Sequence, residues 1–414
     1  MRILIVTPYL PHRRVGHGGG TAVRQMILAL ARRHEVAVLA LRRPAERSID
    51  DLGLGDDVRV ETVAFTDATA RGPARLELAA RRTVSTLRAW LSGRPPYALK
   101  YDHPPLLRRA RELVDEFAPD VVQVEYLQLT AVAASLRRHR GPGTRPRLVL
   151  DSHEHGALPR RRRAAAASGV TRWRLEAAAR SWDRLARDAG RAADVLLAVT
   201  DQDRALLAAA GAAGVVTVPL GIDTRAIVPQ RPEARPKQVL FVGSFAHPPN
   251  RDAARRLCAD IWPEVHARRP DWRLVLAGPG SDGFLAAQDA PPAGVTATGF
   301  VDDLAALFRA SAVFAAPLEA GGGIKIKILE AMARGIPLVT TPIGAEGIVR
   351  EEDDLVGWAA RPEDFAPALL RAIDDPEEAE RRAQRARAHV EAHFGWDAVV
   401  DRLEAIYRES PSGA

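Results

Sequence analysis

The stretch PLEAGGGIKIKILEAMARGIPLVTT (317–341) places three glycines directly before two lysines and a glutamate, where a helix is expected to begin. Glycine lets the backbone approach a ligand closely and turn with positive φ. A helix start adds unpaired N–H groups and the positive end of the helix dipole, which attract an anion. Lys325 and Lys327 increase that positive charge and cost stability unless an anion balances it. The stretch therefore predicts a phosphate-binding loop.

The two lysines are not equivalent in this prediction, because residues two positions apart do not share a helix face. Glu330 follows Lys327 by about one turn and lies on roughly the same side. We therefore predict Lys327 as the phosphate cation and Glu330 as an acceptor for a ligand hydroxyl. The alternative that both lysines are ordinary surface residues that point into water stays open. The buried stripe of this helix is predicted from Ile324, Ile328, Leu329 and Met332, with Gly335 ending the helix before Pro337.

A second glycine-rich loop, HGGGT (17–21), follows the first apolar run of the chain. Neither loop matches the dinucleotide-binding GxGxxG motif or a Walker A motif. Each loop alone is equally compatible with a simple turn. A loop of this kind in each half of the chain predicts that Gly19 and Gly20 also approach a ligand.

The elements that would position these loops alternate along the chain, with short apolar runs between longer amphipathic segments. Such runs predict buried parallel strands joined by helices on both faces of a sheet. Before residue 225 the strands are expected at 3–8, 36–41, 120–126, 147–153 and 194–200, and after it at 239–244, 272–278, 295–300, 311–317 and 336–341.

The proline-rich, charged segment 225–238 is typical of a linker and divides the chain into two α/β halves. We expect an N-terminal domain over 1–216 and a C-terminal domain over 217–393. Residues 394–414 include an amphipathic helix from 396 to 409. Within the helix-rich region 157–191, a set of apolar residues is predicted to pack in the core, namely Trp173, Leu175, Trp182 and Leu185.

The composition is that of a folded protein, with 47 % hydrophobic and 27 % charged residues in 414. No run approaches the roughly 20 apolar residues that span a bilayer, and MRILIVTPYL reads as a first strand rather than a secretion signal. The single cysteine, Cys258, excludes an internal disulfide and a cysteine-based metal site and fits a reducing cytoplasm. We expect a cytoplasmic protein that can contact a membrane peripherally.

The formal charge of +7 is carried mostly by arginine, as in the run Arg160-Arg161-Arg162-Arg163. Nucleic acid, an anionic membrane or a phosphate-bearing small molecule would each suit that charge, as would an ordinary solvated surface. No RNA-binding aromatic motif, zinc knuckle or helix-turn-helix accompanies it. We therefore expect no nucleic-acid partner.

The order of these motifs resembles the retaining glycosyltransferases of family 4, which have the GT-B fold, and the resemblance covers nearly the whole chain. It is carried by PYLPHRRVGHGGGTAVRQMILALARRHEVAVL, VTVPLGID (216–223), FVGSFAHPPNRDA (241–253) and, most specifically, the block from Gly299 to Ile348 that contains GGGIKIKILEAMARG. The resemblance implies two Rossmann-like domains whose parallel sheets face each other across a cleft. It also implies that the C-terminal helix packs back on the first domain.

The resemblance also implies site residues. Glu330 matches the second glutamate of the family's E-x7-E pattern, which holds the ribose of the nucleotide, but Gly322 stands where the first glutamate belongs and Glu319 is out of register. Ser244 and, approximately, Pro249 stand where family members carry an arginine and a lysine on the diphosphate. We infer that Lys325, Lys327 and Arg251 supply that charge instead. The donor loop would include Gly322, Gly323 and Ile324, and the base would lie against Phe300 and Val301.

His153, in the sequence DSHEHG, matches a family histidine that contacts the transferred sugar, and Glu154 replaces the aspartate that commonly follows it. A lone histidine at a strand end is more often structural, but the matched position favours the catalytic role. His155 is not expected to take part. The resemblance implies a metal-independent transfer with retention, in which the leaving phosphate itself deprotonates the acceptor. The pairs Asp302-Asp303 and Asp353-Asp354 are interpreted as a helix start and a surface loop.

The expected donor is a UDP- or GDP-type nucleotide sugar, used as a substrate with no cofactor. The acceptor stays open between a small molecule, a natural product and an envelope glycan precursor, and the oligomeric state stays open too. Two other functions remain. One is a sugar-nucleotide-binding protein without transfer activity, which the missing first glutamate favours. The other is a different GT-B enzyme, such as a phosphorylase or an epimerase, which the run GGGIKIKILEAMARG argues against.

Overall fold

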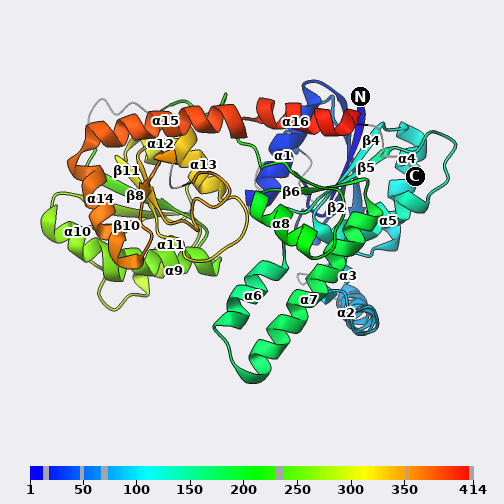
Figure 1. The fold of residues 1–414 in the computed structure, drawn as a ribbon, viewed down its shortest axis with the longest axis horizontal. Coiled ribbons are helices and arrows are strands. Elements are labelled where there is room, and N and C mark those ends of the chain that lie inside the picture. The colour runs from blue at the N-terminus through cyan, green and yellow to red at the C-terminus, as the bar shows by residue number, and fades with distance from the viewer. Residues whose placement is uncertain are drawn as a thin grey trace. The chain divides into compact units, whose positions relative to one another are not determined.

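The computed structural model of the protein describes residues 1–12, 18–46, 51–66, 73–153, 155–229, 236–350 and 353–409 (Figure 1). The chain forms two compact units. Unit 1 comprises Met1–Gly221 together with Trp396–Ala414, and unit 2 comprises Ile222–Gly395. None of the helices in the described part of the chain is long and apolar enough to cross a membrane.

Unit 1 is built on a parallel sheet of seven strands in the order β3-β2-β1-β4-β5-β6-β7. The central strands β4 and β5 are buried along their whole length and β1 along all but its first residue, as expected where helices cover both faces of a sheet. The strands are β1 (Arg2–Thr7), β2 (Glu35–Arg42), β3 (Arg59–Ala64), β4 (Val121–Glu125), β5 (Arg147–Asp151), β6 (Val195–Ala198) and β7 (Val215–Thr217).

Helices cover both faces of this sheet, and each face has its own apolar core. On one face the core includes residues of α4, α5 and α7, and on the other it includes residues of α1 and of the C-terminal helix α16. The helices are α1 (Gly18–Ala31), α2 (Pro73–Ser92), α3 (Pro96–Leu99), α4 (Pro104–Phe117), α5 (Thr130–Arg138), α6 (Ala157–Ala165), α7 (Gly169–Ala192), α8 (Asp201–Ala209) and α16 (Trp396–Arg408), with short 3₁₀ turns η1 (Pro44–Glu46) and η2 (Leu127–Leu129).

Unit 2 repeats this plan with a parallel sheet of six strands in the order β10-β9-β8-β11-β12-β13. Its strands are β8 (Gln238–Val242), β9 (Arg273–Ala277), β10 (Val295–Ala297), β11 (Val313–Ala316), β12 (Leu338–Thr340) and β13 (Gly357–Trp358). Its helices are α9 (Pro248–Arg256), the π-helical turn η3 (Leu257–Ile261), α10 (Trp262–Arg268), α11 (Ser281–Ala286), α12 (Leu304–Arg309), α13 (Ile326–Ala333), the 3₁₀ turn η5 (Pro362–Asp364), α14 (Phe365–Asp374) and α15 (Pro376–Phe394).

The predicted α/β class with two parallel sheets is confirmed, and every strand expected from an apolar run forms. The sheets also contain β3, β7 and β13, which were not predicted. All three are edge strands. β3 and β7 are only partly buried and β13 has two residues, so none has the buried apolar pattern of a central strand.

One predicted core position is wrong. The side chains of Trp182 and Leu185 are buried, but Trp173 is 64 % exposed and Leu175 is only half-buried. Helices α6 and α7 form a hairpin whose tip extends away from the sheet of unit 1 (Figure 1), so the first turns of α7 have no core to pack against. Helical spacing identified the apolar face of α7, but it did not show at which residue the packing of other elements against that face ends.

Candidate active site

The ammonium group of Lys327 lies in the first turn of α13 in unit 2. Its Nζ donates a hydrogen bond to Asn250 Oδ1 at 2.7 Å and lies 4.7 Å from the centre of the Phe241 ring. No carboxylate among the described residues forms an ion pair with it. Phe241 belongs to β8 and Asn250 to α9, so the lysine from α13 lies over the strand-to-helix connection that follows β8.

Two glycines allow this close packing. A Cβ at Gly243, directly after β8, would lie 2.8 Å from both Lys327 Nζ and Asn250 Cγ. A Cβ at Gly278, after β9, would lie 2.2 Å from the carbonyl oxygen of Gly243, and Gly278 has a φ of 118°. Asn250 also donates from Nδ2 to the backbone carbonyl of Ser244 at 2.9 Å. Asn250 therefore fixes the loop after β8 and the lysine head group with a single amide, and the sequence alone did not reveal this role.

Burial lowers the pKa of Lys327 to about 7. The pKa of the neighbouring His247 is lowered as well, first by burial and then by the charge of Lys327. Both shifts show that the charged forms of these side chains are disfavoured by burial, with no compensating anion among the described residues. An anion bound at this position would favour the charged lysine, so the site is poised to bind one.

Lys325, two residues earlier, lies in a different environment. It is the N-cap residue of α13, and its Nζ donates to Glu346 Oε2 at 3.0 Å. Both side chains of this pair are largely buried. The carboxylate of Glu346 thus balances the charge of Lys325 within the protein, whereas Lys327 has no such partner among the described residues.

Glu330 lies one turn after Lys327 on α13 and is half-buried. Its Oε1 accepts two hydrogen bonds from Arg334, from Nε at 3.2 Å and from Nη2 at 2.8 Å. The guanidinium of Arg334 is itself held 4.8 Å from the centre of the Phe308 ring. The second carboxylate oxygen has no hydrogen bond with another described residue and can accept one from a ligand hydroxyl.

The remaining predicted donor residues lie beyond the carboxyl ends of the unit 2 strands, on the loops that follow these strands or on α9. In the glycine loop, Gly321 and Gly323 have positive φ values of 122° and 63°, Gly322 faces open space and Ile324 is buried. Glu319 forms an ion pair with Arg256. Arg251 is exposed on α9, Phe300 is 68 % exposed and Val301 is half-buried. Ser244 is thus brought together with Lys327 through Asn250, and no contact joins Arg251, Phe300 or Val301 to that pair among the described residues.

A hollow in unit 2 lies at the amino ends of its strands, opposite the ends that carry Lys327. It is lined by residues that precede β11 and β12 and by residues of α14 and α15, including Ser311, Ile336, Ile373, Arg387 and Glu391. Parallel α/β sheets bind their ligands outside the carboxyl ends of the strands. We therefore place the candidate site of unit 2 at Lys327 and not in this hollow.

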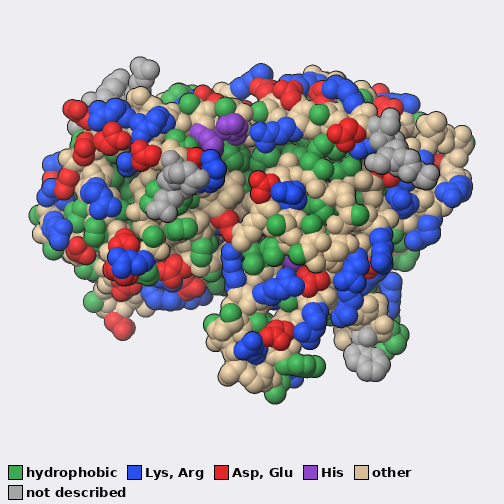
Figure 2. Space-filling view, viewed as in Figure 1, with side chains coloured by type: hydrophobic (Ala, Val, Ile, Leu, Met, Phe, Trp, Pro, Cys, Tyr) green, Lys and Arg blue, Asp and Glu red, His purple; other side chains and the backbone are tan. Residues whose placement is uncertain are grey.

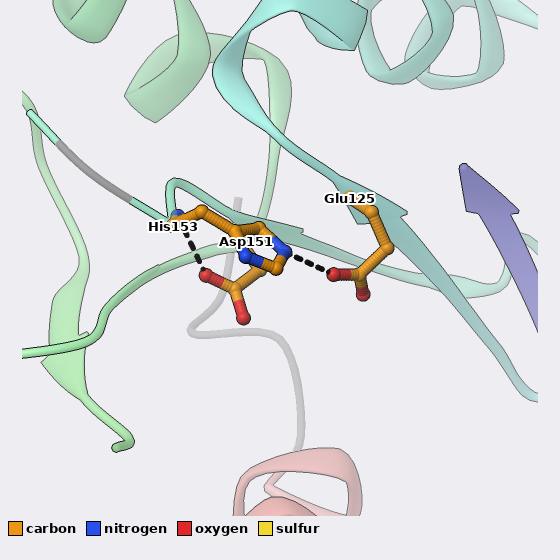
Figure 3. A group of neighbouring side chains, drawn as sticks. All are labelled: Glu125, Asp151 and His153. Carbon is orange, nitrogen blue, oxygen red and sulfur yellow. Dashed lines mark hydrogen bonds and ion pairs between the residues drawn. The ribbon is translucent and has the colours of Figure 1, made fainter. Parts of the chain in front are cut away.

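In unit 1, His153 follows β5 and forms a close pair with Glu125, the last residue of β4 (Figure 3). His153 Nε2 and Glu125 Oε2 are 2.6 Å apart, and both side chains are buried. The backbone N–H of His153 donates to Asp151 Oδ1 at 2.9 Å. The ring of Tyr126 stacks on the imidazole, with ring centres 3.7 Å apart and an angle of 7° between the planes.

The backbone at both stacked residues is strained. His153 has a φ of 56° and Tyr126 a φ of 71°, in the left-handed region that non-glycine residues rarely adopt. Such conformations persist only where the surroundings enforce them, and they concentrate at functional sites. The strain therefore supports a functional role for His153 and directs attention to Tyr126, which was not predicted.

A chain of hydrogen bonds extends from this pair to the C-terminal helix. Gln123 Nε2 donates to Glu125 Oε1 at 2.7 Å, and the Tyr407 hydroxyl of α16 donates to Gln123 Oε1. Burial raises the pKa of Tyr407 far above its usual range, and the nearby Glu125 and Asp151 raise it further. Tyr407 is thus a fixed donor, and α16 takes part in orienting His153. Neither Glu125 nor Tyr407 was predicted. The place of Glu125 at the end of a buried strand could have identified it, whereas nothing local indicates Tyr407.

Glu125, Asp151 and His153 each offer a ligand atom, and these atoms lie within 4.8 Å of one another. Two carboxylates and an imidazole are a donor set that divalent metal ions accept. Nε2 of His153 and Oε2 of Glu125 are, however, engaged with each other. The expectation of a metal-independent site stays a prediction.

The other predicted residues of unit 1 are placed as follows. Gly19 and Gly20 lie in the first turn of α1, while His17 and Glu154 lie outside the described residues. His155 is buried, with its Nε2 3.5 Å from Asp183 Oδ1, and burial lowers its pKa to about 4. His155 is therefore neutral near pH 7 and contacts α7.

Comparison with protein families gives two matches. The "Glycosyltransferase Family 4" profile matches residues 16–226, a little more than half of the chain. The "Glycosyl transferases group 1" profile matches residues 236–375.

Similar curated proteins include a glycogen synthase of Mycobacterium tuberculosis (strain ATCC 25618 / H37Rv), which is 30 % identical over 219 residues, covering 49 % of this chain and 50 % of that protein. The GDP-mannose-dependent monoacylated alpha-(1-6)-phosphatidylinositol monomannoside mannosyltransferase of Corynebacterium glutamicum is 27 % identical over 213 residues, covering 47 % and 56 %. The chain thus spans about half the length of the curated relatives it matches.

Similar solved structures extend over the whole chain. Sucrose-phosphate synthase from Thermosynechococcus elongatus superposes with a TM-score of 0.70 at 18 % identity, covering 99 % of this chain and 98 % of that one. HepE of Anabaena in complex with UDP superposes with a TM-score of 0.66 at 16 % identity, covering 98 % and 99 %. These likenesses show that the chain shares their fold.

The environment of Lys327 predicts that Lys327→Met stabilises the protein in the absence of ligand. The pKa of Lys327 is lowered to about 7 in the folded state, so its charged form opposes folding fully below pH 7 and less and less up to its ordinary pKa. Because part of the side chain stays accessible and Met leaves Asn250 without its partner, we expect a net gain of about 1–2 kcal/mol at pH 7. Thermal melting should show a rise of about 2–5 °C that shrinks toward pH 10.

The matched control for this substitution is Lys325→Met. It leaves the carboxylate of Glu346 without its ion-pair partner and should lower the melting temperature. If both substitutions changed the melting temperature in the same direction, the two lysines would not differ as described.

For Asp151 we predict a stability difference that grows as the pH rises, opposite to the one predicted for Lys327. Burial raises the pKa of Asp151 to about 6. Of its neighbours, His153 lowers this pKa and Glu125 raises it. A carboxyl with a raised pKa contributes most stability below its unfolded pKa of about 4 and loses that contribution as the pH rises through 6. Asp151→Asn, which keeps the acceptor for the His153 N–H, should therefore gain roughly 2 kcal/mol over wild type between pH 4 and pH 6.5. Melting curves measured in half-unit pH steps test this, and a difference independent of pH would contradict it.

Proposed function

The chain belongs to glycosyltransferase family 4 and has the GT-B fold, and we propose that it transfers a sugar from a nucleotide-diphosphate donor to an acceptor hydroxyl, with retention and without a metal ion. The observation that carries this proposal is the half-buried ammonium of Lys327, held over the loop after β8 with no carboxylate partner among the described residues.

The donor is proposed from the chemistry of this loop. The diphosphate would lie against Lys327 and the backbone N–H groups at the start of α13, where the helix dipole adds to the attraction. Glu330 would accept a hydrogen bond from a ribose hydroxyl through the oxygen that Arg334 leaves available. Solved neighbours include HepE in complex with UDP and with UDP-glucose, and curated relatives include GDP-mannose-dependent enzymes. Both support a UDP- or GDP-type donor.

Loss of the nucleoside diphosphate is the demanding part of such a transfer, because negative charge develops on the leaving oxygen. A fixed cation and oriented backbone N–H groups stabilise that charge electrostatically. Lys327 would take up a proton when the diphosphate binds, since the anion restores the pKa that burial has lowered. The protein thus places a full positive charge at the leaving group only when the donor is present.

His153 is proposed to contact the transferred sugar at the reacting centre. The carboxylate of Glu125 accepts from Nε2 and fixes the ring, and Tyr126 limits the rotation of the ring by stacking. In the retaining mechanism proposed here, an oxygen of the leaving phosphate takes the proton of the acceptor hydroxyl on the same face of the sugar. The acceptor itself stays open between a small molecule, a natural product and an envelope glycan precursor.

A second candidate function is sugar-nucleotide binding without transfer. The observation that favours it is Gly322, which faces open space where the family pattern has its first glutamate. Nucleotide binding without detectable donor turnover would establish this second function.

Donor binding is tested by thermal shift with UDP, GDP, ADP and TDP at low salt. We expect one of these nucleotides to raise the melting temperature, by mass action on the folded state. Lys327→Ala should reduce the shift by at least half, because it removes the free cation. Lys325→Ala should retain most of it, because the charge of Lys325 is already balanced by Glu346. No stabilisation by any of the four nucleotides would make the loop structural and remove the basis of the proposal.

The role of Glu125 is tested with Glu125→Gln, which keeps an acceptor but removes the charge that orients His153. We expect kcat for donor turnover, measured as release of nucleoside diphosphate, to fall about 10- to 100-fold, with KM for the donor changed less than threefold. Because the donor loop belongs to unit 2, the thermal shift by nucleotide should be unchanged. A kcat within twofold of wild type would show that the pair is structural only.

A further inference from the structure

The exposed hydrophobic side chains of this protein are concentrated on one part of unit 1. Nine large hydrophobic residues are exposed among those that the structure describes, and six of them belong to α2, α3 and the start of α7. The six are Val84, Leu87, Leu91, Tyr97, Val170 and Trp173. Single exposed apolar residues are ordinary on protein surfaces, but such a concentration marks an interaction site.

The exposed residues of α2 form one stripe. Val84, Leu87 and Leu91 are 54 %, 58 % and 72 % exposed, and their spacing of three and four places them on one face of the helix. Residues on the other side of α2, Ser85 and Ala89, are buried, and the helix packs against α3. The apolar face of an amphipathic helix thus points away from the protein.

The second apolar group lies at the tip of the α6–α7 hairpin. Val170 and Trp173 are 67 % and 64 % exposed and share a face of the first turns of α7. In Figure 1 the hairpin and α2 both extend from the same side of the unit 1 sheet. Tryptophan is the side chain that best suits a boundary between apolar and aqueous surroundings.

Positive charge surrounds these apolar residues. The segment 160–180 contains seven arginines and one acidic residue, Glu176, which pairs with Arg172. The side chains of three exposed arginines form neither an ion pair nor a hydrogen bond with any other described residue, namely Arg163, Arg174 and Arg180. Figure 2 shows Lys and Arg side chains gathered over this part of the molecule, with hydrophobic side chains at the tip of the hairpin.

From this arrangement we propose that α2 and the tip of the α6–α7 hairpin form a docking surface for an anionic lipid bilayer. The apolar side chains project from helices rather than lining a groove, as insertion into the outer part of a bilayer requires. The unpaired arginines would lie at the level of the acidic headgroups, where each contributes an attraction of about 1 kcal/mol.

Other occupants fit less well. A second copy of the chain would bring two arginine-rich surfaces together, which is unfavourable. Nucleic acid would use the arginines but would leave the leucines and the tryptophan without a role, since its binding is dominated by the phosphate backbone. The bilayer uses both features, and the inference does not depend on which sugar or acceptor the enzyme uses.

The test is co-sedimentation of the full chain with vesicles of phosphatidylcholine alone or with 30 % phosphatidylglycerol, at 0.1 M and 0.5 M salt. We expect binding to the anionic vesicles at 0.1 M salt, at least tenfold weaker at 0.5 M salt or on neutral vesicles. Two independent variants, Leu87→Glu/Leu91→Glu on α2 and Val170→Glu/Trp173→Glu on α7, should each reduce binding at least tenfold. All four positions are exposed, so folding should be retained, which circular dichroism checks.

Matched controls separate this surface from net charge. Arg163→Glu/Arg174→Glu should abolish binding, whereas Arg191→Glu/Arg309→Glu makes the same charge change at exposed positions elsewhere and should leave it within threefold. Val228→Glu controls for loss of an exposed apolar residue outside the surface. Equal binding to neutral and anionic vesicles, or retained binding in both apolar variants, would overturn the proposal. So would a dimer in light scattering that the leucine variant dissociates, because it would assign the surface to a second copy.

Discussion

The ammonium group of Lys327 is held at the carboxyl end of β8 by an amide and an aromatic ring, and no carboxylate of the described chain balances it. Gly243 and Gly278 lack side chains where Cβ atoms would displace this group or the adjoining backbone. Asn250 joins the lysine to the loop after β8. Unit 2 therefore holds this amine partly out of water at a cost in stability, and its charged form becomes favourable when an anion binds.

Unit 1 contains a second group of buried polar residues, built on different principles. The Glu125 side chain contacts His153 Nε2, the ring of Tyr126 covers the imidazole, and Gln123 connects the pair to Tyr407 on α16. The side chains of this group are held in fixed orientations by one another, in contrast to the amine of Lys327, which no carboxylate of the described chain balances. The surrounding packing maintains the strained backbone at Tyr126 and His153. The C-terminal helix belongs to unit 1 for a chemical as well as a packing reason.

Much of the fold was accessible from the sequence, because strands buried on both faces produce continuous apolar runs. The edge strands β3, β7 and β13 are short or only partly buried, and they were missed. The unequal environments of Lys325 and Lys327 followed from helical geometry, but the partners Glu346 and Asn250 come from distant segments that only the folded chain brings near. Likewise, Tyr407 has no local signal. Trp173 was placed in the core because spacing reveals a helix face and not whether anything covers it.

The most direct measurement of the central claim is the number of protons taken up when the stabilising nucleoside diphosphate binds at pH 8. Calorimetry in two buffers with different ionisation enthalpies gives this number. With the pKa of Lys327 near 7 in the free protein, wild type should take up about one proton per nucleotide, and Lys327→Met should take up none. Nucleotide binding without proton uptake in wild type would contradict the account, because the diphosphate would then not be neutralised by this lysine.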